Sequence, residues 1–334
     1  MHLQLPLGKN GVKLSKLTVG SMFSGIGGIC SAFKQAGFDI SWANEIDDKA
    51  CKTYKLNFPN TNLIEQDVHK IEPDDNLEVD IITSGFPCQA FSVAGYRKGF
   101  DDDRGNLFFE TARFIDKLKP KSYLLENVKN LKGHDKGNTL KVIQKTLEED
   151  LGYSFIPFIL NSKDYGNIPQ TRERIYIVGF RNEAKGGEKT SNFKIPEPIK
   201  RELNIQDMID ENSVEDKHYY KQNSKIYPLL LESVKSRNSI YQYRRVYVRE
   251  NKSNVCPTLT ANMGTGGHNV PIIKTDKGIR KLTPRECFNF QGFPKNFNIP
   301  LDLAQSHLYK QVGNSVVIPV VKRIATEIKR VINN

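Results

Sequence analysis

A cysteine stands directly after a proline at the end of a short apolar run, and from there it could act as a nucleophile. The run, Val79–Ser84, is rich in β-branched residues and is closed by Gly85, so it predicts a buried strand. Cys88 then lies just past the carboxyl end of that strand, the edge at which open α/β sheets bind ligands and carry out reactions. These residues fit a half-buried structural thiol equally well.

A carboxyl group and two guanidinium groups are predicted at the same edge of the sheet. Glu126 follows the apolar run Ser122–Leu125, and a carboxyl group beside a largely dry pocket can keep a proton near neutral pH and act as an acid. Arg172 and Arg174 alternate as on a strand that continues to Phe180, so both point to one face. Two arginines on one face suit an anionic or carbonyl-rich substrate, and a surface ladder of ion pairs is the alternative.

The elements that must position these groups begin with a strand, a glycine turn and a helix, the opening of a nucleotide-binding unit. Leu17–Phe23 predicts the strand and Ser24–Gly28 the turn. The next strand, Ile40–Asn44, delivers Glu45 about twenty residues after the turn, where an acid can accept both ribose hydroxyls of an adenosine-containing ligand. The turn lacks the third glycine of the G-x-G-x-x-G fingerprint, which argues against a nicotinamide cofactor.

Asp67 stands at the end of a third short run, Asn62–Glu65, and is therefore predicted at the same sheet edge. A carboxylate at that point could accept a hydrogen bond from an adenine amino group. It could equally cap the N-terminus of a helix, because aspartate is a preferred N-cap residue.

A polar segment punctuated by glycines, 93–105, follows Cys88 and precedes an amphipathic helix predicted at 106–118. Because a loop of this length beside a reactive cysteine is unusual, we interpret it as a lid over bound substrate, with Gly95, Gly99 and Gly105 as hinges. Further helices are predicted at 139–150 and from the region after Val316 to Ile332. Between 181 and 198 the composition turns polar, and residues 185–188 within this stretch indicate a linker.

Length and composition predict one large α/β domain and a smaller one in a chain of 334 residues. No stretch of about eighteen apolar residues and no signal peptide is found, so neither a membrane span nor secretion is expected. The five cysteines are far apart and never form a C-x-x-C pair. That spacing argues against a disulfide framework and a zinc site, and it favours a reducing cytoplasm.

The excess positive charge is concentrated in one segment. The formal net charge is +11, and residues 217–281 hold thirteen Lys or Arg against three acids, which places +10 of it there. Six of the thirteen tyrosines lie in the same segment. A basic and aromatic segment suits contact with nucleic-acid phosphates and bases, and a solvated lysine-rich surface is the alternative.

In their order along the chain, these motifs resemble the DNA (cytosine-5)-methyltransferases of bacterial restriction-modification systems. The resemblance covers the chain from Leu17 to its C-terminus except for the basic segment. The matching blocks are Phe23–Gly28, Pro87–Gln89, Glu126–Val128, Gln170–Arg174, Arg285–Cys287 with Gln291–Pro294, and Gly313–Ser315. Two details differ from the family pattern: Asn167 is an extra residue before the arginine pair, and Gln66 replaces a common glycine before Asp67.

The resemblance implies an α/β, Rossmann-like, S-adenosylmethionine-dependent methyltransferase domain formed by residues 1–185 and 306–334. A basic target-recognition domain, 186–305, would be inserted into it. The implied activity is transfer of a methyl group from S-adenosylmethionine to carbon 5 of a cytosine in a specific short sequence of double-stranded DNA. A monomer in the bacterial cytoplasm would protect host DNA, and its partner would be a restriction endonuclease that acts on the same site without needing to contact it. No metal and no membrane would be involved.

The resemblance also implies a role for each reacting residue. The Cys88 thiolate would add to carbon 6 of a flipped-out cytosine, which makes carbon 5 nucleophilic. Protonated Glu126 would bond ring nitrogen 3 and the amino group, Arg174 would hold oxygen 2, and Arg172 would support the same pocket.

Two further sets of residues are expected to bind the cofactor and the DNA. The expected cofactor residues are Phe23, Ser24, Gly25, Gly27, Gly28, Glu45, Ile46, Asp67, Val68, Pro87, Asn314 and Ser315. The expected DNA contacts are Gln89, Ser92, Arg97, Arg244, Arg245, Arg249, Lys252, Thr258 and Thr260.

Two other functions remain compatible with the sequence. One is an RNA cytosine-5 methyltransferase that uses DNA-type motifs on a transfer RNA, for which a smaller basic segment and a different Pro-Cys block would be expected. The other is a catalytically inactive DNA-binding protein that keeps only the fold and the basic segment. The complete set of Cys88, Glu126, Arg172 and Arg174 argues against the second.

Overall fold

The computed structural model describes residues 16–87, 107–182, 192–210, 214–251, 253–265 and 269–334. Several sequence predictions lie outside these residues. They are the nucleophile Cys88, the DNA contacts Gln89, Ser92, Arg97 and Lys252, the lid at 93–105, and the linker at 185–188.

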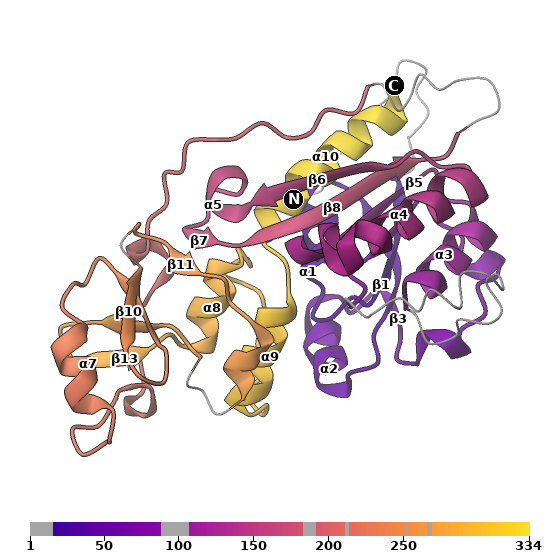
Figure 1. Cartoon of the computed structure of the whole chain (residues 1–334). Helices are drawn as coiled ribbons and strands as arrows, with labels where there is room; N and C mark the ends of the chain where they lie inside the picture. The colour runs from indigo at the N-terminus through magenta and orange to yellow at the C-terminus, as the bar shows by residue number, and fades with distance from the viewer. Residues whose placement is uncertain (1–15, 88–106, 183–191, 211–213, 252, 266–268) are drawn as a thin grey trace, which may run out of the picture.

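A seven-stranded sheet forms the larger part of the molecule, in the order β3-β2-β1-β4-β5-β8-β6 (Figure 1). β1 to β5 run parallel, and β8 runs antiparallel to both of its neighbours. The strands are β1 (Thr18–Met22), β2 (Asp39–Asn44), β3 (Asn62–Ile64), β4 (Ile81–Ser84), β5 (Ser122–Val128), β6 (Ile156–Asn161) and β8 (Glu173–Phe180). This confirms the predicted α/β fold and the strands expected from the apolar runs.

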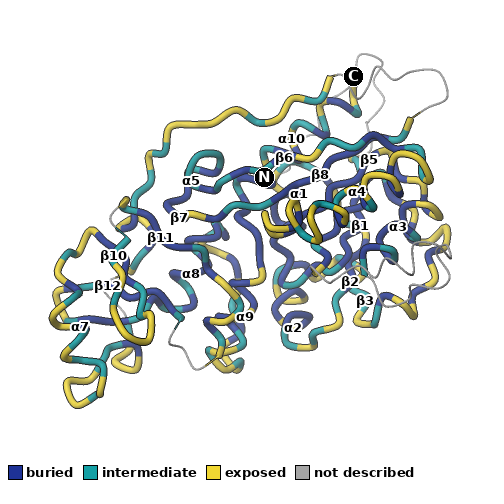
Figure 2. The backbone as a smooth tube through the Cα atoms, in the orientation of Figure 1, coloured by how far each residue is buried: buried dark blue, intermediate teal, exposed yellow. Residues whose placement is uncertain are grey.

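Helices cover both faces of this sheet because its strands are apolar on both sides. Val19, Ile81 and Leu124 pack against α1 and α10, whereas Met22, Ile82 and Leu125 pack against α3 and α4. In Figure 2 the central strands β1, β4, β5 and β8 are accordingly buried, the edge strands β3 and β6 are less so, and the connection at 192–200 is largely exposed. The helices of this part are α1 (Gly28–Gln35), α2 (Asp48–Asn57), α3 (Leu107–Leu118), α4 (Asn138–Lys145), α5 (Ser162–Tyr165) and α10 (Ile318–Asn333).

The helices predicted from sequence are confirmed, with one difference in geometry. The helix expected at 139–150 is α-helical only to Lys145 and continues as a π-helical turn, Thr146–Asp150. Among the described residues, no helix is long and apolar enough to cross a membrane.

A smaller four-stranded sheet lies away from the large one, in the order β10-β9-β12-β13 (Figure 1). It packs against α7 through a separate apolar cluster that includes Leu230, Tyr241 and Ile272. Its elements are α7 (Tyr227–Ser233), β9 (Ile240–Tyr243), β10 (Val248–Asn251), β12 (Ile272–Lys274) and β13 (Ile279–Lys281). A short parallel pair, β7 (Gln170–Thr171) with β11 (Cys256–Pro257), links this region to the start of β8.

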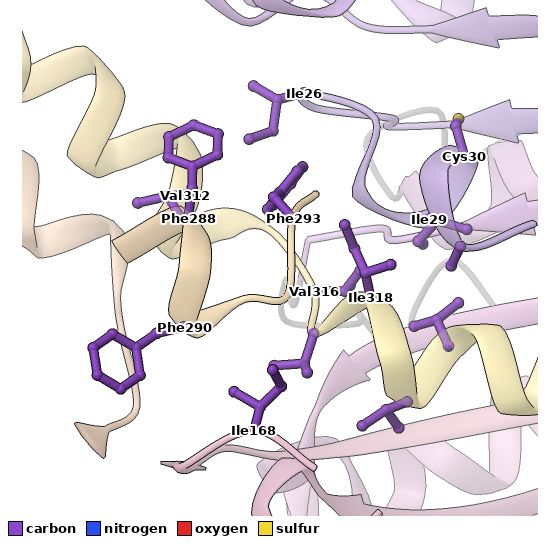
Figure 3. Packing of buried hydrophobic residues seen from close by; sticks show 14 of the residues in the cluster. Ile26, Ile29, Cys30, Ile168, Phe288, Phe290, Phe293, Val312, Val316 and Ile318 are labelled. Carbon is purple, nitrogen blue, oxygen red and sulfur yellow. The ribbon is translucent and has the colours of Figure 1, made fainter. Parts of the chain in front are cut away.

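Helices α8 (Pro284–Phe290) and α9 (Gln305–Asn314) join the two regions through one continuous core. Phe288 and Phe293 belong to the same buried cluster as Val312 of α9 and Ile318 of α10, and Figure 3 shows these side chains gathered from the different segments. The boundary predicted at 305/306 therefore falls within a shared core, and the division into domains remains a prediction.

A fully buried ion pair holds β13 to α8. Arg280 donates to both carboxylate oxygens of Glu286 at 2.8 and 2.7 Å, and neither side chain is exposed to solvent. Glu286 also accepts from the backbone amides of Asp210 and Thr283. A buried guanidinium depends on such a partner, because removing one member of the pair leaves an uncompensated charge.

Replacing Glu286 by Gln is therefore expected to destabilise the protein by about 3–5 kcal/mol, because Arg280 keeps its charge without a counter-ion. The urea midpoint of unfolding would measure this loss. The double variant Arg280→Met/Glu286→Gln is the control, since it removes both charges but keeps an oxygen that can accept from the backbone amides, and it is expected to cost much less. An unchanged midpoint in the single variant would contradict the structural role of the pair.

Candidate active site

A pocket of about 630 Å³ opens at the carboxyl ends of β1, β2, β4 and β5. That position is where the topology of a parallel sheet places ligands. The predicted cofactor residues that line it are Phe23, Ser24, Gly25, Gly28, Glu45, Ile46, Asp67, Val68, Pro87, Asn314 and Ser315. Glu126, Arg172 and Arg174 line the same pocket, so the structure brings the two predicted sets together.

Gly27 is the predicted cofactor residue that does not line the pocket. It precedes α1 with φ 86°, and a Cβ at this position would lie 2.3 Å from the ring of Phe58. The need for glycine here is therefore explained by backbone conformation and close packing.

The glycine turn is fixed to the end of β2. The backbone amide and Oγ of Ser24 both donate to the carbonyl of Asn44, at 2.9 and 3.0 Å. The amide of Gly25 donates to Glu45 Oε2 at 2.7 Å, and apart from its chain neighbours no described residue has a heavy atom within 4 Å of the position that a Gly25 Cβ would take. The turn therefore leaves open space where a ligand can approach the backbone.

The Glu45 carboxylate uses part of its hydrogen-bonding capacity within the protein and keeps the rest for a ligand. Its Oε1 accepts from the amides of Ile46 and Asp47, both at 2.9 Å. With the Gly25 bond, these take three of about four acceptor positions on an ionised carboxylate. The remaining capacity and the location in the pocket fit a hydroxyl-bearing ligand such as the ribose of S-adenosylmethionine.

Asp67 is an N-cap, which confirms one of the two interpretations of this residue. It caps the short helix Val68–Lys70 by accepting from the amide of His69, and its Oδ1 also lies 2.7 Å from His69 Nδ1. The bonds from His69 lower the pKa of the Asp67 carboxyl. Because Asp67 also lines the pocket, the cap does not exclude a contact with adenine. The neighbouring Gln66 contributes its carbonyl, which accepts from Asn44 Nδ2 at 2.7 Å.

The segment 310–316 forms the opposite wall of the pocket. Ser315 Oγ is buried and has no hydrogen-bond partner among the described residues. A Cβ on Gly28 would lie 2.4 Å from this oxygen and 3.1 Å from Val316 Cγ2. An unsatisfied hydroxyl beside a glycine-sized space fits a bound polar ligand, and it supports the predicted place of Ser315 in the cofactor site.

Replacing Gly28 by Ala is expected to weaken binding of S-adenosylmethionine about tenfold or more, because the methyl group pushes Ser315 from its place in the pocket wall. Isothermal titration calorimetry would measure the affinity. Gly133→Ala is a matched control, since no heavy atom lies within 4 Å of the position that its Cβ would take. Equal affinities of the two variants would show that Gly28 is not needed for the site.

Glu126 faces Arg174 at the end of β5. Arg174 Nε lies 3.0 Å from Glu126 Oε1, and both side chains are largely buried. Although the two groups form an ion pair, Oε1 accepts no hydrogen bond from a described residue, so its alignment is poor. The burial of both Arg172 and Arg174 shows that the surface-ladder alternative is wrong.

Asn127 anchors the segment that leads to Cys88. Its Nδ2 donates to the carbonyl of Phe86 at 2.8 Å, and Phe86 and Pro87 line the pocket. Pro87 is the last residue described before Cys88, and it lines the same pocket as Glu126. In the sequence, Asn127 was recognised only as part of the block Glu126–Val128. Its position directly after Glu126 was the signal that could have indicated a role in the site.

Arg172 links β7 and β8 to two later segments by hydrogen bonds to their backbone carbonyls. Its Nη1 donates to the carbonyl of Leu259 at 2.6 Å, and its Nη2 donates to the carbonyls of Gly313 and Ser315. Burial, and secondarily the nearby Arg174, lower the pKa of this guanidinium to about 9. Both terminal nitrogens donate to backbone carbonyls, which favours a positioning role for Arg172, while its buried Nε has no hydrogen-bond partner among the described residues.

The extra residue Asn167 has a structural use. It adopts φ 53°, and its Oδ1 accepts from the amides of Glu202 and Leu203 at 2.7 and 3.1 Å. It thereby fixes the segment that follows the predicted linker. The insertion does not keep Arg172 and Arg174 from the pocket.

The described DNA-contact candidates fall in two places. Arg244, Arg245 and Arg249 are exposed on the hairpin of β9 and β10. Thr258 and Thr260 follow β11, where Thr258 Oγ1 donates to the carbonyl of Thr171 and Thr260 is exposed.

Sequence reasoning missed the contacts that close the pocket between α2 and α9. Lys310 Nζ lies 2.9 Å from Asp47 Oδ2, and this bond contributes to a lowered pKa of the Asp47 carboxyl, which burial opposes. Gln311 accepts from Thr53 Oγ1 and donates to the carbonyl of Lys49. Gln311 lies two residues before the block Gly313–Ser315, but the neighbouring sequence does not indicate its hydrogen-bond partners in α2.

Comparison with known proteins decides the family. The profile of the C-5 cytosine-specific DNA methylases matches residues 17–330. The chain belongs to this family. Among curated relatives, the type II methyltransferase M.Bsp6I of Bacillus sp. (strain RFL6) is 57% identical over 316 residues, covering 93% of this chain and 98% of its own. M.HhaI of Haemophilus parahaemolyticus is 37% identical over 96% of this chain and 97% of its own.

Solved structures agree on the fold of this methylase. A mutant of Spodoptera frugiperda DNMT2 superposes with a TM-score of 0.72 at 22% identity, covering 96% of this chain and all of that one. As a C-5 cytosine DNA methylase, the protein uses S-adenosylmethionine to methylate carbon 5 of cytosine in DNA. Attack by a cysteine and flipping of the target base are common to the family.

Proposed function

We propose that this methylase binds S-adenosylmethionine in the 630 Å³ pocket and methylates one cytosine within a short, specific duplex sequence. The observation that supports this proposal is that the glycine turn, Glu45 and Ser315 share one pocket with Glu126 and Arg174. The cofactor supplies an electrophilic methyl group when bound. Glu45 would accept from its ribose hydroxyls, Asp67 would lie near its adenine, and Ser315 near its methionine part.

Carbon 5 of cytosine is too poor a nucleophile to react unaided, so the chain must activate the ring. The Cys88 thiolate would add to carbon 6, which gives carbon 5 the electron density needed to accept the methyl group. A base would then remove the carbon 5 proton, the carbon 6–sulfur bond would break, and Cys88 would leave as a thiolate. Asn127 would support this step by fixing Phe86 and Pro87 immediately before the nucleophile.

Glu126 would donate a hydrogen bond to ring nitrogen 3 and stabilise the charge that develops on attack. Arg174, which contacts Glu126 in the pocket, would bind oxygen 2 of the same ring.

The basic segment would bind the duplex and select the target sequence, as the inserted domain 186–305. Thirteen Lys or Arg in residues 217–281 supply the charge for contacts with phosphates. We infer that the protein acts as a monomer in the bacterial cytoplasm. There it would protect host DNA beside an endonuclease that cuts the same sequence and need not touch it.

Bisulfite sequencing tests the proposal. Plasmid DNA is incubated with the purified protein and S-adenosylmethionine, and cytosines protected from conversion are mapped. We expect protection at one cytosine of a single recurring sequence. Absence of any protected cytosine would contradict the proposal and would favour an RNA substrate or an inactive binder.

Binding to DNA is expected to weaken by about a thousandfold or more between 50 and 200 mM salt, because phosphate contacts release counter-ions. Fluorescence anisotropy with a labelled duplex would measure it. A duplex without the target sequence is the control and should show a similar slope, since this contribution is independent of sequence. A flat titration would show that the basic segment does not bind phosphates.

A further inference from the structure

Two arginine side chains converge on one glutamine oxygen in the four-stranded sheet. Gln242 on β9 lies directly opposite Arg249 on β10, and Arg244 follows Gln242 by two residues. Arg249 Nη2 donates to Gln242 Oε1 at 2.6 Å, and Arg244 Nη2 donates to the same oxygen at 3.1 Å. Both arginines are exposed, and neither forms an ion pair with a residue that the structure describes.

The opposite side of β9 is used for packing. Tyr241 is buried in the cluster under α7, and its hydroxyl accepts from the amides of Lys235 and Ser236 at 3.2 and 2.8 Å. Because side chains alternate along a strand, Gln242 points to the other face of the sheet. On that face Ile240 is buried in the main core, but Arg244 and Arg249 at the hairpin end are exposed, so the Gln242–Arg244–Arg249 group is accessible to a partner.

Repulsion between the two guanidinium groups disfavours their convergence on Gln242 Oε1. Two like charges share an acceptor that neutralises neither of them, which is unfavourable in the absence of a further partner. Contacts with phosphates need positive charge but not a fixed guanidinium plane. A paired contact with guanine O6 and N7 does need that plane to be held, because both hydrogen bonds must align at once.

The surroundings also fit a nucleic-acid groove. β10 is the edge strand of its sheet, and a two-stranded ribbon is one of the elements that the major groove admits. At the tip of the hairpin, Val246 is 84% exposed and Tyr247 is 55% exposed. Apolar side chains of this kind can contact sugars or the methyl group of thymine.

We propose that Gln242 is a positioning residue that orients Arg244 and Arg249 to read guanine bases in the major groove of the target sequence. This inference rests on the proposed function, because it requires the basic segment to contact duplex DNA. Each guanidinium carries five N–H donors and Gln242 takes one from each, so donors remain for the paired contact with guanine.

The test uses a pool of duplexes in which the base pairs around the methylated cytosine are randomised. Methylated products of each variant are sequenced after bisulfite treatment. Arg244→Ala and Arg249→Ala are each expected to relax the preference for a G·C pair at one position, by about tenfold or more. Gln242→Ala removes no charge and is expected to weaken discrimination at both positions without changing the salt dependence of binding.

Arg245→Asn is the matched control. Arg245 lies on the same hairpin and loses the same charge, Gln242 does not contact it, and asparagine tolerates its φ of 65°. We expect this variant to weaken binding to all sequences alike. Affinity for S-adenosylmethionine, measured for every variant, reports whether each one is folded.

The outcomes separate the two proposals. If Arg244→Ala and Arg249→Ala only weaken binding uniformly, as the control does, the arginines bind phosphates and the inference is wrong. If Gln242→Ala leaves both preferences intact, the glutamine does not position them. If the wild-type protein methylates no cytosine in the pool, it is the proposed function that fails.

Discussion

Replacing Cys88 by Ser is expected to abolish methyl transfer, with a loss of more than about a thousandfold in rate. A serine hydroxyl is far less acidic than a thiol, so it supplies almost no anion to add to carbon 6 of the cytosine. Single-turnover transfer of a labelled methyl group from S-adenosylmethionine to duplex DNA would measure the loss. DNA affinity should stay close to that of the wild type, because the two side chains differ by one atom.

Cys51→Ser is the control for this experiment. Cys51 is a buried residue of α2, and its pKa is raised to about 12, mainly by burial, so it is no source of thiolate. We expect it to retain methylation. Activity that survives in Cys88→Ser would mean that another group attacks the ring.

Replacing Glu126 by Gln is expected to lower the rate of methyl transfer by about 10²–10⁴-fold, the usual contribution of a positioned general acid. Glutamine keeps the size of the side chain but cannot transfer a proton to ring nitrogen 3. It also removes the ion pair with Arg174, which lies 3.0 Å away. The chemical step should therefore slow while the affinity for S-adenosylmethionine changes little.

Glu173→Gln provides the comparison. Glu173 lies beside Arg174 in the chain, and its carboxylate pairs with Lys129 at the surface, 2.9 Å away. Surface ion pairs of this kind contribute little, so the variant should react at the rate of the wild type. A similar rate in both variants would remove Glu126 from the reaction.

Much of the site was predictable because it depends on local order in the sequence. Each of Glu45, Asp67 and Glu126 follows a short apolar run, and the carboxyl ends of parallel strands meet at one edge of the sheet. The glycine turn was recognisable for the same reason, since its backbone conformation requires particular residues at particular places. Such features need no knowledge of distant contacts.

The remaining features depend on contacts between segments far apart in sequence. Arg172 was expected to support the substrate pocket, which it lines, but its contacts with the carbonyls of Leu259 and Gly313, 87 and 141 residues later, could not be foreseen. The ion pair between Lys310 and Asp47 spans 263 residues. Nothing in the local pattern distinguishes a buried guanidinium that binds carbonyls from one that binds a substrate.

The wall formed by 310–316 and the packing of α10 against α1 have a consequence for the timing of synthesis. Strands β1 to β5 leave the ribosome long before the residues that complete their cofactor pocket and cover α1. At about 5–20 residues per second, the glycine turn exists for many seconds without Ser315 opposite it. A nascent chain that lacks these residues therefore has neither a complete cofactor pocket nor the helix that covers α1, and its apolar sheet face must be covered by other means until they are made.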